Sequence, residues 1–193
     1  MRVEMVMEAE ALRFILIALM AGVDVEIMAG RSVRETMREL GLTDEESRTL
    51  VRTVFLDGRP VDDFDATSVA AGASLALGAA MPGLVGAVLR SGSPFSVFRE
   101  DISAGAGQAA PATPGRITLK VFNLVAEALM PRLLARGICL EASRLERHLA
   151  AEPHGFWASV TDIRLEGAPV NPAELLARCR QDPGAEVRLT VRS

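Results

Sequence analysis

The chain has 193 residues, of which 49% are hydrophobic and 24% are charged. These proportions are typical of a folded globular protein, and they exclude global intrinsic disorder. The length allows one domain or two small ones. With 21 basic and 25 acidic residues the net charge is -4, too acidic for a protein whose main role is to coat nucleic acid. We therefore expect no nucleic-acid partner.

Two apolar stretches have to be weighed as targeting or membrane segments. Residues 14–23 could pass for the core of a secretion signal, but Glu4, Glu8 and Glu10 precede them, whereas a signal peptide begins with basic residues. Residues 69–89 carry no charge and are long enough to cross a bilayer. Their glycine, alanine and proline content makes them weakly hydrophobic. We expect a cytoplasmic chain without a membrane partner.

Taken in chain order, the first half predicts strand, strand, helix, strand, strand. The apolar run 12–19 and the alternating residues 23–27 predict the first two strands. Ser32 and Glu35 form a capping box that opens a helix, and Gly41 closes it. A second short helix is predicted at 44–51. Strands follow at 53–56 and 74–78, with Asp57-Gly58 as a tight turn after the first of these.

Glycine, alanine and proline dominate residues 100–115, a composition typical of a flexible linker. This linker divides the chain into a predicted domain at 1–99 and a second α+β domain at 116–193. In the second domain the pattern predicts a strand at 117–122, a helix at 124–136 interrupted at Pro131, a strand at 138–140 and a helix at 144–151.

Two short segments of the first half recur in the second. Leu56–Val61 aligns with Leu165–Val170, and Gly72–Leu77 aligns with Gly184–Leu189, at offsets of 109 and 112 residues. Two matches in the same order favour a duplicated unit.

The helix-opening residues Ser32–Glu35, the stretch Val54–Val61 and the strand Gly72–Leu77 resemble the ubiquitin-like β-grasp family, in particular the sulfur carriers of thiamine and molybdopterin synthesis. The resemblance covers about residues 12–83. It implies an α+β fold with a β-grasp-like N-terminal domain and a second, duplicated β-grasp-like half. The family acts through a free Gly-Gly terminus, whereas Met81-Pro82-Gly83-Leu84 stands at that place here and 109 residues follow.

Four residues of the second half invite comparison with a zinc site: Cys139, His148, His154 and Cys179. Zinc motifs bring their ligands in close pairs, whereas the spacings here are 9, 6 and 25 residues. We expect reduced, buried thiols, no metal, no cofactor and no catalytic histidine. A cluster of acids, Asp57, Asp62, Asp63 and Asp65, is interpreted as a solvated turn because it lacks the spacing of a calcium loop.

A β-grasp domain is complete by Gly78, yet apolar residues continue to Phe98. They pack on the second half, on another copy of the chain or on a different protein. We interpret them as partner-binding residues: Met81, Leu84, Val85, Val88, Leu89, Phe95 and Phe98.

The predicted function is that of a non-catalytic β-grasp adaptor or accessory subunit, which presents a sheet edge and this apolar segment to a protein partner or to itself. One alternative is a sulfur-carrier-related auxiliary of molybdopterin or thiamine-type cofactor synthesis. A carrier of this kind would have to be cleaved after Gly83. The other alternative is an enzyme with a site between the two halves.

Overall fold

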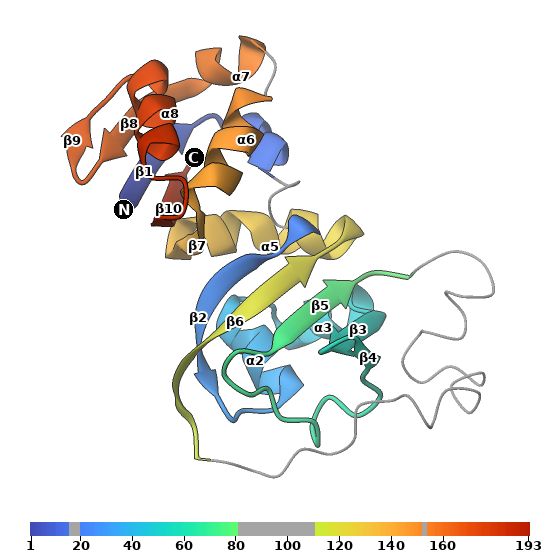
Figure 1. The fold of residues 1–193 in the computed structure, drawn as a ribbon. Helices are drawn as coiled ribbons and strands as arrows, with labels where there is room; N and C mark the ends of the chain where they lie inside the picture. The colour runs from blue at the N-terminus through green and yellow to red at the C-terminus, as the bar shows by residue number, and fades with distance from the viewer. Residues whose placement is uncertain (16–19, 81–110, 152–153) are drawn as a thin grey trace. The chain divides into compact units, whose positions relative to one another are not determined.

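A computed structural model describes residues 1–15, 20–80, 111–151 and 154–193. The chain is a mixed α+β protein, as the sequence predicts (Figure 1). It forms two compact units. Unit 1 contains Met1–Val23 and Met130–Ser193, and unit 2 contains Asp24–Leu129. This division does not follow the predicted boundary at residues 100–115. Strands that precede the boundary in the sequence pair with strands that follow it, in both units.

In unit 2 the strands of the sheet lie in the order β4-β3-β5-β6-β2. Its elements are β2 (Val23–Ala29), α2 (Val33–Leu40), α3 (Asp44–Thr49), β3 (Thr53–Leu56), β4 (Arg59–Pro60), β5 (Ser74–Gly78) and β6 (Thr113–Val121). The two central strands β5 and β6 are parallel, whereas β3 is antiparallel to β4 and to β5. Strand β2 runs against β6, since Thr118 bonds to Asp24 while Gly115 approaches Ala29 (Figure 1).

One face of this sheet is buried against the helices. Every second residue of β5 points inward, so that Leu75 and Leu77 are fully buried, and Met37 of α2 packs on the same side without exposure. The predicted helix is confirmed in detail. Ser32 accepts from the Glu35 amide, the Glu35 side chain accepts from the Ser32 amide, and Gly41 ends the helix in the left-handed conformation. The second short helix, α3, is capped in the same way.

In unit 1 the strands lie in the order β7-β10-β1-β8-β9. Its elements are β1 (Arg2–Met7), the 3₁₀ helix η1 (Ala9–Ile15), β7 (Ile138–Glu141), α6 (Ala142–Ala150), α7 (His154–Ala158), β8 (Val160–Leu165), β9 (Ala168–Pro169), α8 (Pro172–Gln181) and β10 (Glu186–Arg192). The central strands β1 and β10 are parallel, and their outer neighbours β8 and β7 are antiparallel to them. Helix α5 (Asn123–Arg136) carries the chain from unit 2 into unit 1.

The predicted first strand at 12–19 is wrong within the described residues, because residues 9–15 form η1. The strand of this region is β1, which lies earlier in the sequence. Val3, Met5 and Met7 are buried and alternate with exposed residues along it. Such alternation indicates a strand with one buried face. It pairs with β10 and β8 of unit 1 and with no strand of unit 2.

The first of the two sequence matches has a counterpart in the backbone. Asp57-Gly58 and Glu166-Gly167 both have positive φ, and each turn joins two strands in the same register. The second match does not hold in three dimensions. Strand β5 pairs with β3, but the strand that pairs with β8 is β1 and not β10. Correspondingly, Asp57 binds the Ser74 amide and Glu166 binds the Arg2 amide.

Two further expectations need correction. Residues 113–115 of the predicted linker belong to β6, where Gly115 permits close approach, since a Cβ there would lie 3.0 Å from that of Ala29. Helix α5 continues through Pro131, which is exposed, so water can reach the carbonyl that its missing N–H leaves unbonded. Within the described residues, none of the helices combines the length and apolarity needed to span a membrane.

Candidate binding pocket

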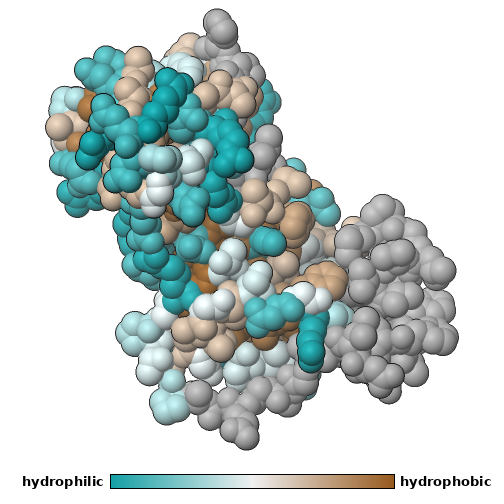
Figure 2. All heavy atoms as spheres, viewed as in Figure 1, coloured by the Kyte–Doolittle hydropathy of each residue, from teal (hydrophilic) through white to brown (hydrophobic). Residues whose placement is uncertain are grey.

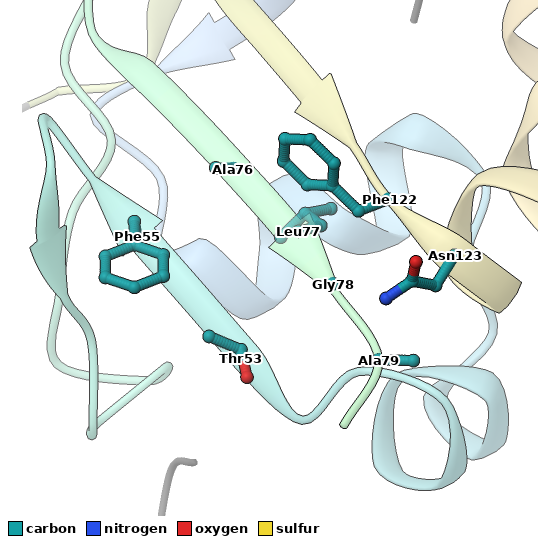
Figure 3. A pocket seen from close by; sticks show the side chains of 8 residues that line it. All are labelled: Thr53, Phe55, Ala76, Leu77, Gly78, Ala79, Phe122 and Asn123. Carbon is teal, nitrogen blue, oxygen red and sulfur yellow. The ribbon is translucent and has the colours of Figure 1, made fainter. Parts of the chain in front are cut away.

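The open face of the unit 2 sheet, opposite its helices, carries a pocket of about 300 Å³. Its lining residues are Thr53, Phe55, Ala76, Leu77, Gly78, Ala79, Phe122 and Asn123. Figure 3 shows Phe55 of β3 and Phe122, the residue after β6, on either side of Ala76 of β5, with Thr53 and Asn123 toward the end of β5. The pocket lies where β5 leads out of the sheet.

Strand alternation explains why this surface is apolar and hollow. In β3 the neighbours Val54 and Leu56 point into the core, so Phe55 points outward and is partly exposed. In β5 the outward residues beside the phenylalanines are Ala76 and Gly78, which fill little space. Large side chains on the outer strands and small ones between them leave a depression over β5.

The pocket offers few polar groups. Thr53 is 3% exposed, and its Oγ1 has no hydrogen-bond partner among the residues that the structure describes. Asn123 is exposed and adopts a φ of 55°, a left-handed conformation that asparagine tolerates better than most residues. Among the described residues, those that line the pocket include no titratable side chain. They can bind an apolar group and hydrogen-bond to a polar group beside it, and they supply no acid or base.

Apolar exposure continues beyond the pocket. Leu124, at the start of α5, is 56% exposed. In the described part of the chain this exceeds the exposure of Val6 and Met20, the other exposed large hydrophobic residues. Figure 2 shows apolar residues of unit 2 reaching the surface among hydrophilic ones. Exposed apolar side chains beside a pocket are compatible with an interaction site.

The terminal strands β4 and β9 are less suited to pairing with a partner. Each contains two residues, one of which is a proline, Pro60 or Pro169. Proline lacks the N–H that a ladder requires, so such a short strand presents a poor template for an added strand. The predicted use of a sheet edge therefore gains no support from β4 or β9.

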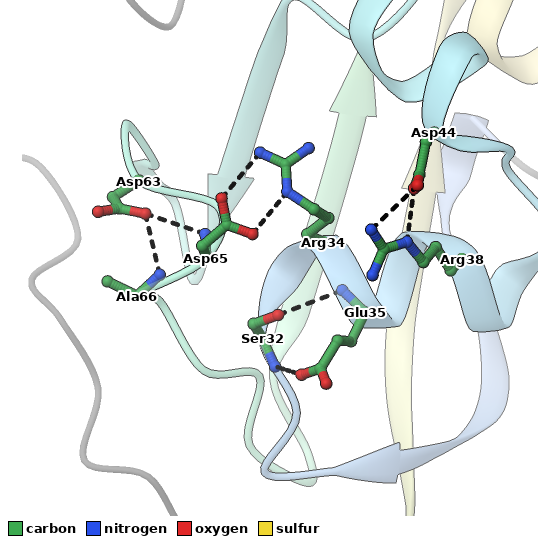
Figure 4. A network of polar contacts seen from close by, with 8 residues as sticks. All are labelled: Ser32, Arg34, Glu35, Arg38, Asp44, Asp63, Asp65 and Ala66. Carbon is green, nitrogen blue, oxygen red and sulfur yellow. Dashed lines mark hydrogen bonds and ion pairs between the residues drawn. The ribbon is translucent and has the colours of Figure 1, made fainter.

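The acidic cluster has structural partners (Figure 4). Asp65 accepts two hydrogen bonds from Arg34, at 2.6 and 3.0 Å, and Asp63 accepts from the amides of Asp65 and Ala66. The bonds from Arg34 lower the pKa of the Asp65 carboxyl, and an equivalent pair with Arg38 lowers that of Asp44. In the described residues no group of three or more potential ligands could hold a metal ion.

Of the residues weighed as a zinc or catalytic site, the side chains of Cys139, His148 and Cys179 are described and form no metal site, whereas the side chain of His154 lies outside the described structure. Cys139 and Cys179 are buried, and burial raises the pKa of the Cys179 thiol, with Glu146 adding to the effect. His148 lines a cavity of about 10 Å³ among leucine, isoleucine and phenylalanine side chains. Desolvation lowers its pKa, and Arg144 and Arg147 lower it further. Such a cavity has no room for a substrate.

The seven predicted partner-binding residues, from Met81 to Phe98, lie outside the described residues, as does Gly83. None of the residues lining the pocket was among them. A signal was nevertheless present after β6, because Phe122 continues the outward phase of Thr118 and Lys120, out of phase with the buried residues of that strand. An aromatic residue on the outward phase of an amphipathic strand indicates an uncovered face.

Comparisons with protein-family models, with curated proteins and with solved structures give no match to this chain. Its function is therefore inferred from its own residues and their arrangement.

Proposed function

We propose that the chain is a non-catalytic, β-grasp-like adaptor or accessory subunit that binds a partner protein in a larger assembly. The observation that carries this proposal is the apolar pocket on the open face of unit 2, in which the described lining residues carry no titratable group. Aromatic side chains, phenylalanine included, are enriched at protein interfaces relative to the rest of the protein surface. The docking surface is the sheet face instead of its edge.

Two features support a β-grasp-like and duplicated architecture. Unit 2 has a helix packed across one face of a mixed sheet whose two central strands are parallel. Unit 1 has the same order of pairing directions, with β10 and β1 in the places that β6 and β5 hold in unit 2. In unit 2 the central strand β5 follows β4 in the sequence, whereas in unit 1 helix α8 and β10 follow β9. In this interpretation the N-terminal β1 takes the place of that central strand in unit 1.

The proposal can be tested by filling the pocket. Ala76→Trp places a large ring over β5, whereas Ser74→Trp places the same ring on the same strand and face outside the lining. Each variant, and the unchanged chain, is tagged and recovered from the cells that make it. We expect Ala76→Trp to lose the co-purifying partner, or the dimer, that the unchanged chain and Ser74→Trp retain.

Both variants should melt close to the unchanged chain, because the two positions lie outside the core. Equal recovery of the same partner by Ala76→Trp and Ser74→Trp would refute the use of this pocket. A chain that stays monomeric and recovers no partner in any form would contradict the adaptor role.

A further inference from the structure

A single lysine stands beside the pocket, and it is the only lysine of the chain. In the parallel ladder of β5 and β6, Lys120 is the register partner of Ala76, which lines the pocket. Lys120 alternates with the buried residues Leu119 and Val121, so its side chain leaves the sheet on the open face. Directly opposed residues on one face have Cβ atoms about 5 Å apart, so the lysine stem borders the hollow over Ala76.

The charge of Lys120 is not compensated within the described residues, where its ammonium makes no ion pair or hydrogen bond. Two acids lie on the same face. Asp24 accepts a hydrogen bond from the hydroxyl of Thr118, and Glu26 has interactions with other groups. The side chain is partly buried. A lysine in this setting packs its methylenes on apolar surface and holds its charge at the rim.

A second polar group without a partner lies at the other end of the pocket. The Thr53 Oγ1 is buried and has no hydrogen-bond partner in the described part of the chain, although buried polar atoms nearly always have one. A hydroxyl can donate to a carbonyl or accept from an N–H, and a peptide backbone offers both. The exposed amide of Asn123 lies in the same lining and adds two donors and an acceptor.

We propose that this pocket binds a partner peptide in which an apolar side chain is flanked by a carboxylate, with Lys120 as the residue that selects the charge. This inference rests on the proposed adaptor function and names the chemistry of its partner. The volume of about 300 Å³ suits one or two apolar side chains and lies at the small end of ligand pockets. Peptide groups can form hydrogen bonds with the side chains of Thr53 and Asn123, whereas a hydrocarbon chain cannot.

The probes are three fluorescein-labelled nonapeptides of a Gly-Ser background with a central Phe, in which the residues on either side are Asp, Ser or Lys. Fluorescence anisotropy with the full chain should give the tightest binding for the Asp-flanked peptide. Binding should weaken as salt rises, because the contact with Lys120 is at the surface. Lauric acid serves as a competitor that carries the same two chemical groups without a peptide backbone.

Lys120→Met keeps most of the apolar stem and removes the charge, whereas Lys120→Arg keeps the charge. We expect Lys120→Met to weaken the Asp-flanked peptide about tenfold, the size of one charge-assisted contact of 1.4 kcal/mol, and to leave the Ser-flanked peptide unchanged. Lys120→Arg should bind within about threefold of the unchanged chain. Ala76→Trp should abolish binding of all three peptides.

The outcomes separate this inference from the proposed function. Equal binding of the Asp- and Ser-flanked peptides, or no effect of Lys120→Met, overturns the charge preference while leaving a pocket that still depends on Ala76. Binding of lauric acid with no binding of any peptide overturns the choice of a peptide. If no probe binds while Ala76→Trp still loses the co-purifying partner, the peptide chemistry is wrong and the adaptor function stands.

Discussion

Single side chains on the surface of unit 2 hold segments that are distant in sequence. Arg34 of α2 reaches Asp65 through two hydrogen bonds, and its guanidinium lies 5.8 Å from the centre of the Phe64 ring. This pair ties the loop that follows β4 to the helix. Asp65 is 67% exposed, so water and salt screen the pair and its contribution to stability is small.

The Asp65 pair should make the stability of the chain depend on pH in a defined window. Its pKa is lower in the folded chain than in the unfolded one, so its stabilisation is present above about pH 4 and is lost as pH falls through the folded value. Asp65→Asn should lower the melting temperature slightly at pH 7 and should match the unchanged chain near pH 2. Glu127→Gln is the control, because Glu127 is also exposed. A difference in melting temperature between Asp65→Asn and the unchanged chain that grows toward pH 2 would contradict this prediction.

Gly115 is a residue whose lack of a side chain matters for packing. A Cβ at this position would lie 3.0 Å from that of Ala29 and 3.1 Å from that of Ala71, and neither can rotate away because each is fixed to its backbone. We expect Gly115→Ala to lower the free energy of unfolding by about 1–3 kcal/mol. Gly184→Ala is the matched control, since nothing lies within 4 Å of its added Cβ. Urea denaturation measures both, and equal stability of the two variants would be inconsistent with this packing.

At the scale of elements, the N-terminal strand β1 lies inside the unit 1 sheet, between β10 and β8. Met5 is 1% exposed there, whereas its neighbour Val6 points to the open face and is 39% exposed. Met5→Ala should cost about 2–5 kcal/mol of unfolding free energy, because it leaves a cavity in the core. Val6→Ala should cost less than about 1 kcal/mol. Comparable losses in denaturation of the two variants would mean that β1 does not occupy this place.

At the scale of the whole molecule, the chain crosses between its units more than once. Strand β1 belongs to unit 1 with the C-terminal part, and β6 belongs to unit 2 with the N-terminal part. Each half of the chain therefore supplies a central strand to a sheet built mostly by the other half. This arrangement differs from two domains that follow one another along the chain.

Cleavage of the connection between β5 and β6 tests this arrangement. A protease site is inserted between Gly105 and Ala106, and the folded chain is cut. The two pieces should co-elute in size exclusion and separate only in denaturant, because β5 remains paired with β6 and β10 with β1. Two pieces that separate without denaturant would favour independent halves at 1–99 and 116–193.

The candidate site was the part of the molecule least accessible from the sequence. Each lining residue is ordinary in its own strand, and the hollow arises because Ala76 and Gly78 of β5 lie between Phe55 and the residue after β6. The 34 residues between Gly78 and Thr113 separate β5 from β6, and no local pattern specifies that the two strands pair. Helix α8 was also missed, although Asn171 and Glu174 form a capping box before it.

The sequence by itself determined the features that depend on neighbouring residues: the capped helix that begins after Ser32, the acid-glycine turns at Asp57 and Glu166, and the α+β class. These follow from backbone preferences and hydrogen bonds over a few residues, which short patterns encode. Only the tertiary structure decided which strands lie side by side, because pairing depends on burial of whole faces and on chain connections of any length. Strand pairing places β1 in unit 1 and β6 in unit 2, contrary to the predicted boundary, and it forms the pocket over β5.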